Sequence, residues 1–164
     1  MKTLSITTIL FIIAVLISCA SAKESTHLES LLHPKENTYA IGDTAHGGIV
    51  FLVNQEGTHG LVCALEDQMI NSSYHQCFEM INDPRYHDEY GKKYFDWRLP
   101  KLWEAYKMYM NLHMINLGNF EETGYWTSQS TRSFEKMHVL NFSKGIDFTV
   151  FKTDTYKARA VRTF

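Results

Sequence analysis

The residues best suited to acid–base chemistry lie in one stretch near the middle of the chain. His87, Asp88 and Glu89 are consecutive, and Asp83 and His75 precede them. Carboxylates beside imidazoles act as general acids and bases where a fold holds them in one pocket. The same residue types are also common on solvated surfaces. An enzyme that uses the 83–89 loop is therefore an alternative hypothesis to a binding or structural role.

Other catalytic signatures are weak. None of the serines has the flanking glycines of a nucleophile elbow. The sequence has no C-x-x-C pair and no H-x-x-x-H spacing, so we expect no metal site and no cofactor.

Basic residues are concentrated near the C-terminus. Residues 136–164 contain six Lys and Arg but only two Asp and no Glu. Sulfates and carboxylates favour such clusters because charge-assisted hydrogen bonds are strong and Arg adds planar bidentate contacts. We predict an anionic, for example sulfated, glycan as the partner and no nucleic acid. The residues predicted to bind the glycan are Lys144, Lys152, Lys157 and Arg159.

Two observations weigh against that prediction. The first half of the exported chain is acidic, and charges of both signs are usually distributed over a surface for solubility. If the two halves interleave in the fold, counter-charges cancel a positive field within about 8 Å at physiological salt.

The N-terminus predicts export. Lys2 precedes an apolar run over residues 9–17, which has the order of a signal peptide and is shorter than the roughly 20 residues of a membrane-spanning helix. Two processing sites compete. Residues 16–19 resemble a lipobox, so that the leader would end at residue 18 and Cys19 would carry a lipid that anchors the protein to a membrane. Alternatively, Ala20-Ser21-Ala22 ends a signal peptide over 1–22. The protein is then a cell-envelope lipoprotein or a secreted protein.

Cys63 and Cys77 are the cysteines left after Cys19. In an oxidising compartment an isolated pair is most simply a disulfide, and closing a loop of about 15 residues contributes about 3 kcal/mol in the chain-entropy model. The alternative is that Cys63 is a small buried hydrophobic residue in a strand.

Behind the leader we expect a polar tether over residues 23–38 and a single domain over 39–164, because about 140 residues suffice for one core. Apolar, β-branched runs at 49–53 and 61–64 flank a turn with glycine and predict a hairpin. Residues 66–95 show no sustained periodicity and predict a long irregular segment with a short helix near 74–81.

The remaining elements follow from periodicity. Apolar residues at helical spacing after Pro100 predict an amphipathic helix over 101–112, whose Met and aromatic stripe we assign to core packing. Runs at 125–128, 137–142, 147–152 and 158–162 predict strands, with a turn at Lys144-Gly145. The fold class is therefore α+β, an antiparallel sheet with one main amphipathic helix.

Five short motifs in this order resemble the Lcl C-terminal-domain family. They are Gly47-Gly48-Ile49-Val50-Phe51, His59-Gly60-Leu61-Val62, Asp96-Trp97-Arg98-Leu99-Pro100, Gly124-Tyr125-Trp126-Thr127-Ser128 and Arg159-Ala160-Val161-Arg162. The resemblance covers about residues 41–164. It implies an extracytoplasmic domain similar in shape to C-type-lectin-like and formylglycine-enzyme-like folds.

The founding adhesin of that family trimerises and binds sulfated glycans, so the resemblance implies an adhesin-like role and a homotrimer. The collagen-like repeats of the adhesin are missing from this sequence. Within the motifs, the chemistry of Trp97 and Trp126 predicts burial. Arg98 before the helix predicts a structural role, either pairing with a carboxylate or capping loop carbonyls. Three classes of function stay open: a glycan-binding module, a small extracytoplasmic enzyme using the 83–89 loop, and a structural envelope lipoprotein.

Overall fold

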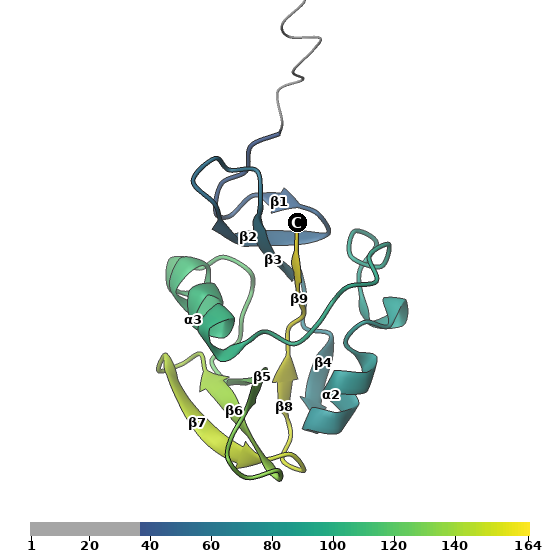
Figure 1. The fold of residues 1–164 in the computed structure, drawn as a ribbon, viewed down its shortest axis with the longest axis vertical. Helices are drawn as coiled ribbons and strands as arrows, with labels where there is room; N and C mark the ends of the chain where they lie inside the picture. The colour runs from purple at the N-terminus through teal and green to yellow at the C-terminus, as the bar shows by residue number, and fades with distance from the viewer. Residues whose placement is uncertain (1–36) are drawn as a thin grey trace, which may run out of the picture. The chain divides into compact units, whose positions relative to one another are not determined.

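The structure, a computed structural model, describes residues 37–164. The predicted leader, the lipidation site Cys19 and nearly all of the predicted tether lie outside these residues. Two sheets and two α-helices organise the described chain, which confirms the α+β class (Figure 1). The sheet orders are β1-β2-β3-β9 and β4-β8-β5-β6-β7. The strands are β1 (Thr44–Ala45), β2 (Gly48–Val53), β3 (Gly60–Ala64), β4 (Met69–Ser72), β5 (Gly124–Ser130), β6 (Lys136–Asn141), β7 (Ile146–Phe151), β8 (Tyr156–Ala158) and β9 (Val161–Thr163).

The first sheet is built on the predicted hairpin, which is confirmed. β2 and β3 pair antiparallel, with Gly48 opposite Ala64 and Val53 opposite Gly60. A Cβ added to Gly60 would lie 2.1 Å from the backbone oxygen of Leu52, so the close approach of the two backbones requires glycine there. β9 adds to the other edge of β3.

The second sheet contains the predicted meander β5-β6-β7, whose strand positions are confirmed to within two residues. Gly145 makes the turn between β6 and β7 with a φ of 64°, a conformation that costs glycine little. β4 was not predicted, because its four residues lie inside the irregular segment. β8 joins β4 to β5 and pairs parallel with β5.

The predicted strand over residues 158–162 is wrong in one respect. The segment forms two strands in different sheets, with β8 ending at Ala158 and β9 beginning at Val161. The interruption falls at Arg159, whose side chain is buried, and at Ala160, whose backbone N–H donates to the Gln68 side chain at 2.5 Å. Long-range side-chain bonds therefore replace the regular strand ladder at this point.

Both predicted helices are present. The short helix α2 (Tyr74–Met80) begins at Ser73, whose side chain forms a capping box with Gln76. In the main helix α3 (Leu102–Asn111), Glu104 accepts a hydrogen bond from the Lys101 backbone at 2.7 Å and pairs with Arg98 at 2.6 Å. Arg98 thus has the structural role predicted for it. The 3₁₀ helices are η1 (Pro84–Tyr86) and η2 (His113–Ile115).

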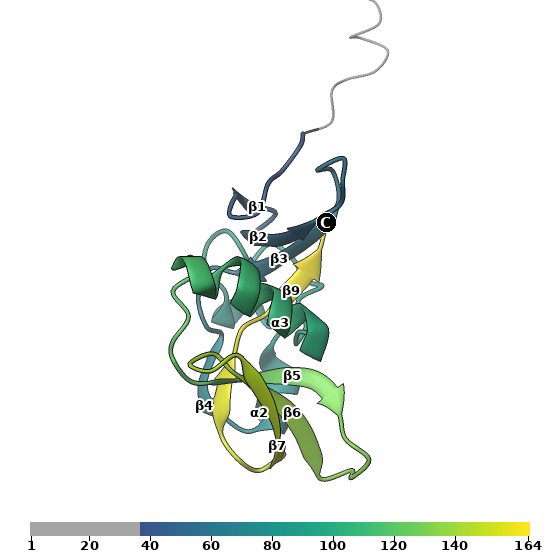
Figure 2. The same cartoon turned by 90° about the vertical axis from the view of Figure 1, so that its left-hand side faces the viewer.

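The core has two clusters. α3 lies beside the sheets on one side and α2 on the other, as Figures 1 and 2 show. The cluster under α3 contains Met108, Leu112 and Phe142, and the other cluster contains Trp97 and Trp126. Both tryptophans are buried, as predicted.

The predicted disulfide is not formed in the structure. In the described part of the chain, Cys63 and Cys77 are both free, buried thiols. Cys63 packs in the cluster under α3, whereas Cys77 packs in the other cluster, so the two side chains belong to different parts of the core. Burial raises the pKa of Cys63 to about 11 and that of Cys77 to about 12, which keeps both protonated at neutral pH. Cys63 therefore matches the alternative of a small buried residue in a strand.

Candidate functional site

The acid–base residues of the 83–89 loop do not converge on one point. Asp83 accepts hydrogen bonds from the backbone and the side chain of Arg85, and these hold the pKa of its carboxyl down to about 2. Asp88 caps the following turn by accepting from the backbone of Tyr90 and Gly91. Each carboxylate is occupied by its own neighbours in sequence.

The remaining members of that loop are also engaged locally. Glu89 pairs with Lys92, and His75 on α2 pairs with Glu79. His87 stacks on Trp97 at a centroid distance of 4.9 Å, and its Nε2 bonds the backbone oxygen of Ile81 at 2.7 Å. Each of these side chains is therefore engaged by a nearby residue.

The four cations predicted to bind a glycan are divided between surface and interior. Lys144 is exposed and Lys152 is half-buried, and they precede and follow β7, which separates their backbones by roughly 25 Å at the rise of an extended strand. Lys157 and Arg159 are buried, with 6% and 2% of their surface exposed. The structure therefore does not bring the four residues together on one surface.

Lys157 and Arg159 instead meet a carboxylate that the sequence did not single out. Asp67 accepts from Arg159 Nε at 2.7 Å and from Lys157 Nζ at 3.0 Å. The Tyr125 hydroxyl donates to the same carboxylate at 3.2 Å. Burial alone would lower the pKa of Lys157, but hydrogen bonds to Glu121 and Asp67 raise it above its usual value. We call Asp67, Tyr125, Lys157 and Arg159 the Asp67 cluster.

The Asp67 cluster holds one loop of the surface. Arg159 Nη1 donates to the backbone oxygen of Gly118 at 2.8 Å, and its guanidinium lies 4.4 Å from the centroid of the Phe120 ring. Lys157 pairs with Glu121 at 2.5 Å, and the Tyr125 hydroxyl accepts from the Glu121 backbone. Arg159 also contacts the backbone oxygen of Asn119 at 3.5 Å. Each of the four consecutive residues 118–121 therefore contacts the buried cluster.

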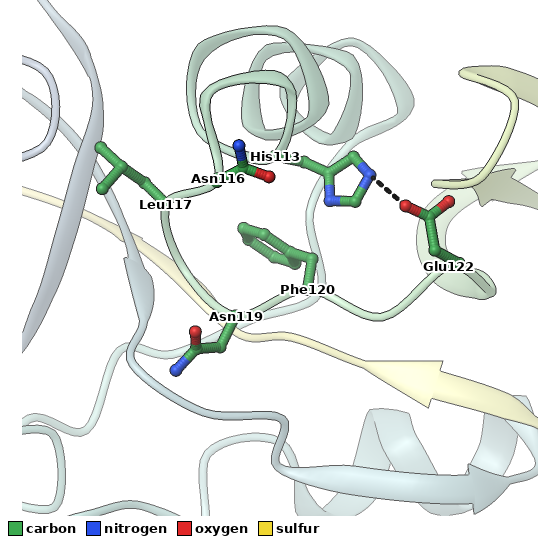
Figure 3. Close-up of a pocket in the computed structure, with 6 residues that line it drawn as sticks. All are labelled: His113, Asn116, Leu117, Asn119, Phe120 and Glu122. Atoms are coloured by element: carbon green, nitrogen blue, oxygen red, sulfur yellow. Dashed lines mark ion pairs between the residues drawn. The ribbon is translucent and has the colours of Figure 1, made fainter.

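On its outer side the same loop lines a pocket of about 210 Å³, shown in Figure 3. Asn116 and Asn119 have φ values of 58° and 48°, and Gly118 has 84°, so the chain bends sharply around the cavity. Asn tolerates this left-handed conformation better than most residues. The lining residues are His113, Asn116, Leu117, Asn119, Phe120 and Glu122.

The pocket combines a histidine–glutamate pair with an aromatic ring. His113 Nε2 lies 3.4 Å from Glu122 Oε1, and the Phe120 ring lies next to this pair (Figure 3). Phe120 is fixed from behind by edge and tilted contacts with Tyr125 and Phe142 at 5.7 and 4.9 Å. The aromatic wall is therefore rigid, whereas the Glu122 side chain is 69% exposed and free to reorient.

The pocket presents hydrogen-bonding side chains, the face of an aromatic ring and an imidazole beside a carboxylate. Within residues 37–164, no three His, Cys, Asp or Glu side chains are placed to hold a metal ion together. The same described range contains no helix that is both long and apolar enough to cross a membrane.

Sequence reasoning missed every residue of this pocket. None of the candidate residues named from the sequence lies between residues 113 and 122. The available signal was Asn116-Leu117-Gly118-Asn119, in which two asparagines flank a glycine, a composition typical of left-handed backbone.

Comparison with protein-family models and with curated proteins finds no match for this chain. Membership of the Lcl C-terminal-domain family stays a prediction.

Proposed function

We propose that this protein is an exported binding module that takes a neutral saccharide unit into the pocket between η2 and Glu122. The observation that carries the proposal is the pairing of a rigid aromatic wall, Phe120, with hydrogen-bonding side chains at the rim of a cavity. A sugar presents an apolar face of C–H groups and a ring of hydroxyls. Small-ligand sites join an apolar contact to a few placed polar groups in the same way.

The size and polarity of the cavity support this ligand class. A volume of about 210 Å³ is below the range typical of drug-sized ligands and suits a single ring. The Glu122 carboxylate can accept a hydrogen bond from a sugar hydroxyl, and the Asn116 amide can donate one to the oxygen of a sugar hydroxyl.

The charge of the site favours a neutral glycan over the sulfated one expected from sequence. A sulfate in the pocket would lie beside the Glu122 carboxylate. Lys157 and Arg159 already pair with Asp67, so neither is left to offset that repulsion. We therefore keep the binding-module class and change the ligand and its residues.

Export rests on the apolar leader, and lipidation rests on Cys19. A binding module outside the cytoplasm needs neither a catalytic cluster nor a cofactor. The local engagement of the 83–89 carboxylates supports this class over the enzyme alternative.

A glycan array probed with the full chain tests the proposal. We expect retention on neutral saccharides, and we expect Glu122→Ala to weaken it about tenfold or more, because a hydrogen bond to a charged group contributes about 1.5–3 kcal/mol. Glu135→Ala is the matched control, since Glu135 is an exposed carboxylate outside the pocket. Equal loss in both variants, or retention on sulfated glycans alone, would contradict the proposal.

A further inference from the structure

The outer face of α3 carries an apolar stripe that no element of the described chain covers. Trp103, Met110 and Met114 are 48%, 56% and 60% exposed. Trp103, Lys107 and Met110 follow one another at spacings of four and three residues, which places them on one side of α3. Met114 lies in η2, which follows the helix. The sequence assigned this Met and aromatic stripe to the core. That assignment is right for Met108 and wrong for Trp103 and Met110.

The stripe continues past the end of the helix. Ile115 in η2 and Leu117 after it are exposed, and so is Ile41. A Cβ on Gly42, the neighbour of Ile41, would lie 3.1 Å from Leu117, so these segments are in contact. We call Trp103, Lys107, Met110, Met114, Ile115, Leu117 and Ile41 the outer α3 face.

The charges that α3 itself presents to solvent are positive. Residues 101–117, all of them described, contain one carboxylate, Glu104, which is 2% exposed and paired with Arg98. Lys101 and Lys107 are therefore the charges that the helix offers to the outside.

A second apolar surface provides a contrast. Phe134 is 95% exposed and Phe151 is 48% exposed, but the exposed carboxylates Glu135 and Asp154 lie beside them in the sequence. Within residues 101–117 the exposed apolar side chains have no exposed carboxylate among them. The exposed carboxylates Asp43 and Glu122 lie at the margins of the outer α3 face, near Ile41 and His113.

We propose that the outer α3 face docks on an anionic phospholipid surface. Its apolar side chains would enter the interfacial region, where Trp is favoured, and its lysines would lie among the phosphates. The presence of Lys107 within this face favours a membrane over a second copy of the chain as the partner. A protein interface excludes lysine from its centre, and a symmetric pair of helices would bring two copies of Lys107 together, whereas at a bilayer a lysine extends its ammonium group to the phosphates.

The position of the face in the chain supports the same partner. Ile41 lies four residues from the start of the described chain, and the apolar leader precedes it. The proposal therefore rests in part on the proposed export and lipid anchor, but not on the pocket. The pocket shares Leu117 with this face, so the two sites are adjacent.

Trp103 provides the probe. It is the exposed tryptophan among the three of the chain, because Trp97 and Trp126 are 3% and 0% exposed. Full-length protein is added to phosphatidylglycerol vesicles that carry brominated acyl chains, and tryptophan emission is recorded. We expect quenching that disappears in Trp103→Phe and is weak in vesicles of phosphatidylcholine alone.

Charge reversal supplies the second arm. Each basic residue near an anionic surface contributes roughly a factor of five to binding, so Lys101→Glu/Lys107→Glu should lower the ratio of docked to undocked domain by about 30-fold or more. Lys144→Glu/Lys152→Glu is the matched control and should quench like the wild type. These are surface changes, and circular dichroism verifies that both variants fold.

Three results would overturn the proposal. One is the absence of Trp103 quenching in anionic vesicles that sediment with the protein. Another is quenching that the Lys101 and Lys107 reversals leave unchanged. The third is a concentration-dependent shift of Trp103 emission in lipid-free buffer, which would assign the face to a second copy. Saccharide binding on the array is independent of all three.

Discussion

Two aspartate–arginine pairs in this molecule lie in different environments, one in the interior and one at the surface. In the Asp67 cluster, the Asp67 and Arg159 side chains are 9% and 2% exposed and join segments 92 residues apart. In the 83–89 loop, Asp83 pairs with Arg85, which is two residues away and has a side chain that is 80% exposed. The first group fixes the wall of the pocket from the interior. The second shapes its own turn, so charge composition alone did not identify the candidate site.

The largest expected effect comes from breaking the buried group. Asp67→Ala removes the carboxylate that Lys157, Arg159 and Tyr125 share and leaves two buried cations without it. Breaking a buried ion pair by removing one partner costs about 3–5 kcal/mol, so we expect a loss of that size in the free energy of unfolding. Urea denaturation followed by circular dichroism measures it.

Asp83→Ala is the matched control for that experiment. It removes a carboxylate that pairs with arginine in the same way but at the surface, where such pairs contribute little. A midpoint close to that of the wild type is expected. If the two variants lost equal stability, the distinction between the two groups would be wrong.

The thiols provide a second comparison, between the interior and the solvent. With pKa values of about 11 and 12, Cys63 and Cys77 contain little of the reactive thiolate at neutral pH. In the folded protein we expect iodoacetamide to modify both at least 100-fold more slowly than after unfolding, since the ordinary cysteine pKa is near 8.5. Mass spectrometry of the two peptides without reductant measures this. Peptides that stay unmodified after unfolding would indicate the disulfide expected from sequence.

A smaller effect distinguishes the buried histidines from the exposed ones. Among residues 37–164, His46 Nε2 and His87 Nδ1 are buried without a hydrogen-bond partner. Burial lowers the pKa of both residues, and for His46 the nearby Arg162 and Lys93 lower it further. For His87, the carbonyl of Ile81 and the carboxylates Asp88 and Asp83 oppose the effect without reversing it.

The direction of the pH dependence follows from these pKa values. A histidine whose pKa is lowered in the folded state binds protons more weakly there than in the unfolded chain. Its contribution is therefore complete above the unfolded value of 6.5 and declines as the pH falls below it. We expect the midpoint of thermal unfolding to fall between pH 7.5 and 5.5, and to fall less in His46→Phe/His87→Phe. The same reduction in His75→Gln, where the histidine is exposed, would argue against this origin.

Local patterns predicted the parts of the fold that local forces determine. Alternating and helical spacing gave the β2-β3 hairpin, the meander and α3, because each segment carries its own apolar face. The interruption at Arg159 was not predictable in this way. It depends on Asp67, which is 92 residues away and lies in a segment without periodicity.

The candidate site was less predictable than the fold. Its wall depends on left-handed residues at 116–119 and on contacts from the interior, neither of which a charge count detects. The local ion pairs of the 83–89 loop were easier to predict, because Asp83 and Arg85, and Glu89 and Lys92, are near neighbours in sequence.

The central claim is that the cavity lined by His113, Phe120 and Glu122 is the ligand site of this module. The most direct measurement is a ¹H–¹⁵N NMR titration of the protein with the neutral saccharide that it binds most strongly on the array. We predict that shift changes concentrate in residues 113–122, with smaller ones at Tyr125 behind the wall. Changes confined to the 83–89 loop, or to Lys144 and Lys152, with the 113–122 resonances unmoved, would contradict the account.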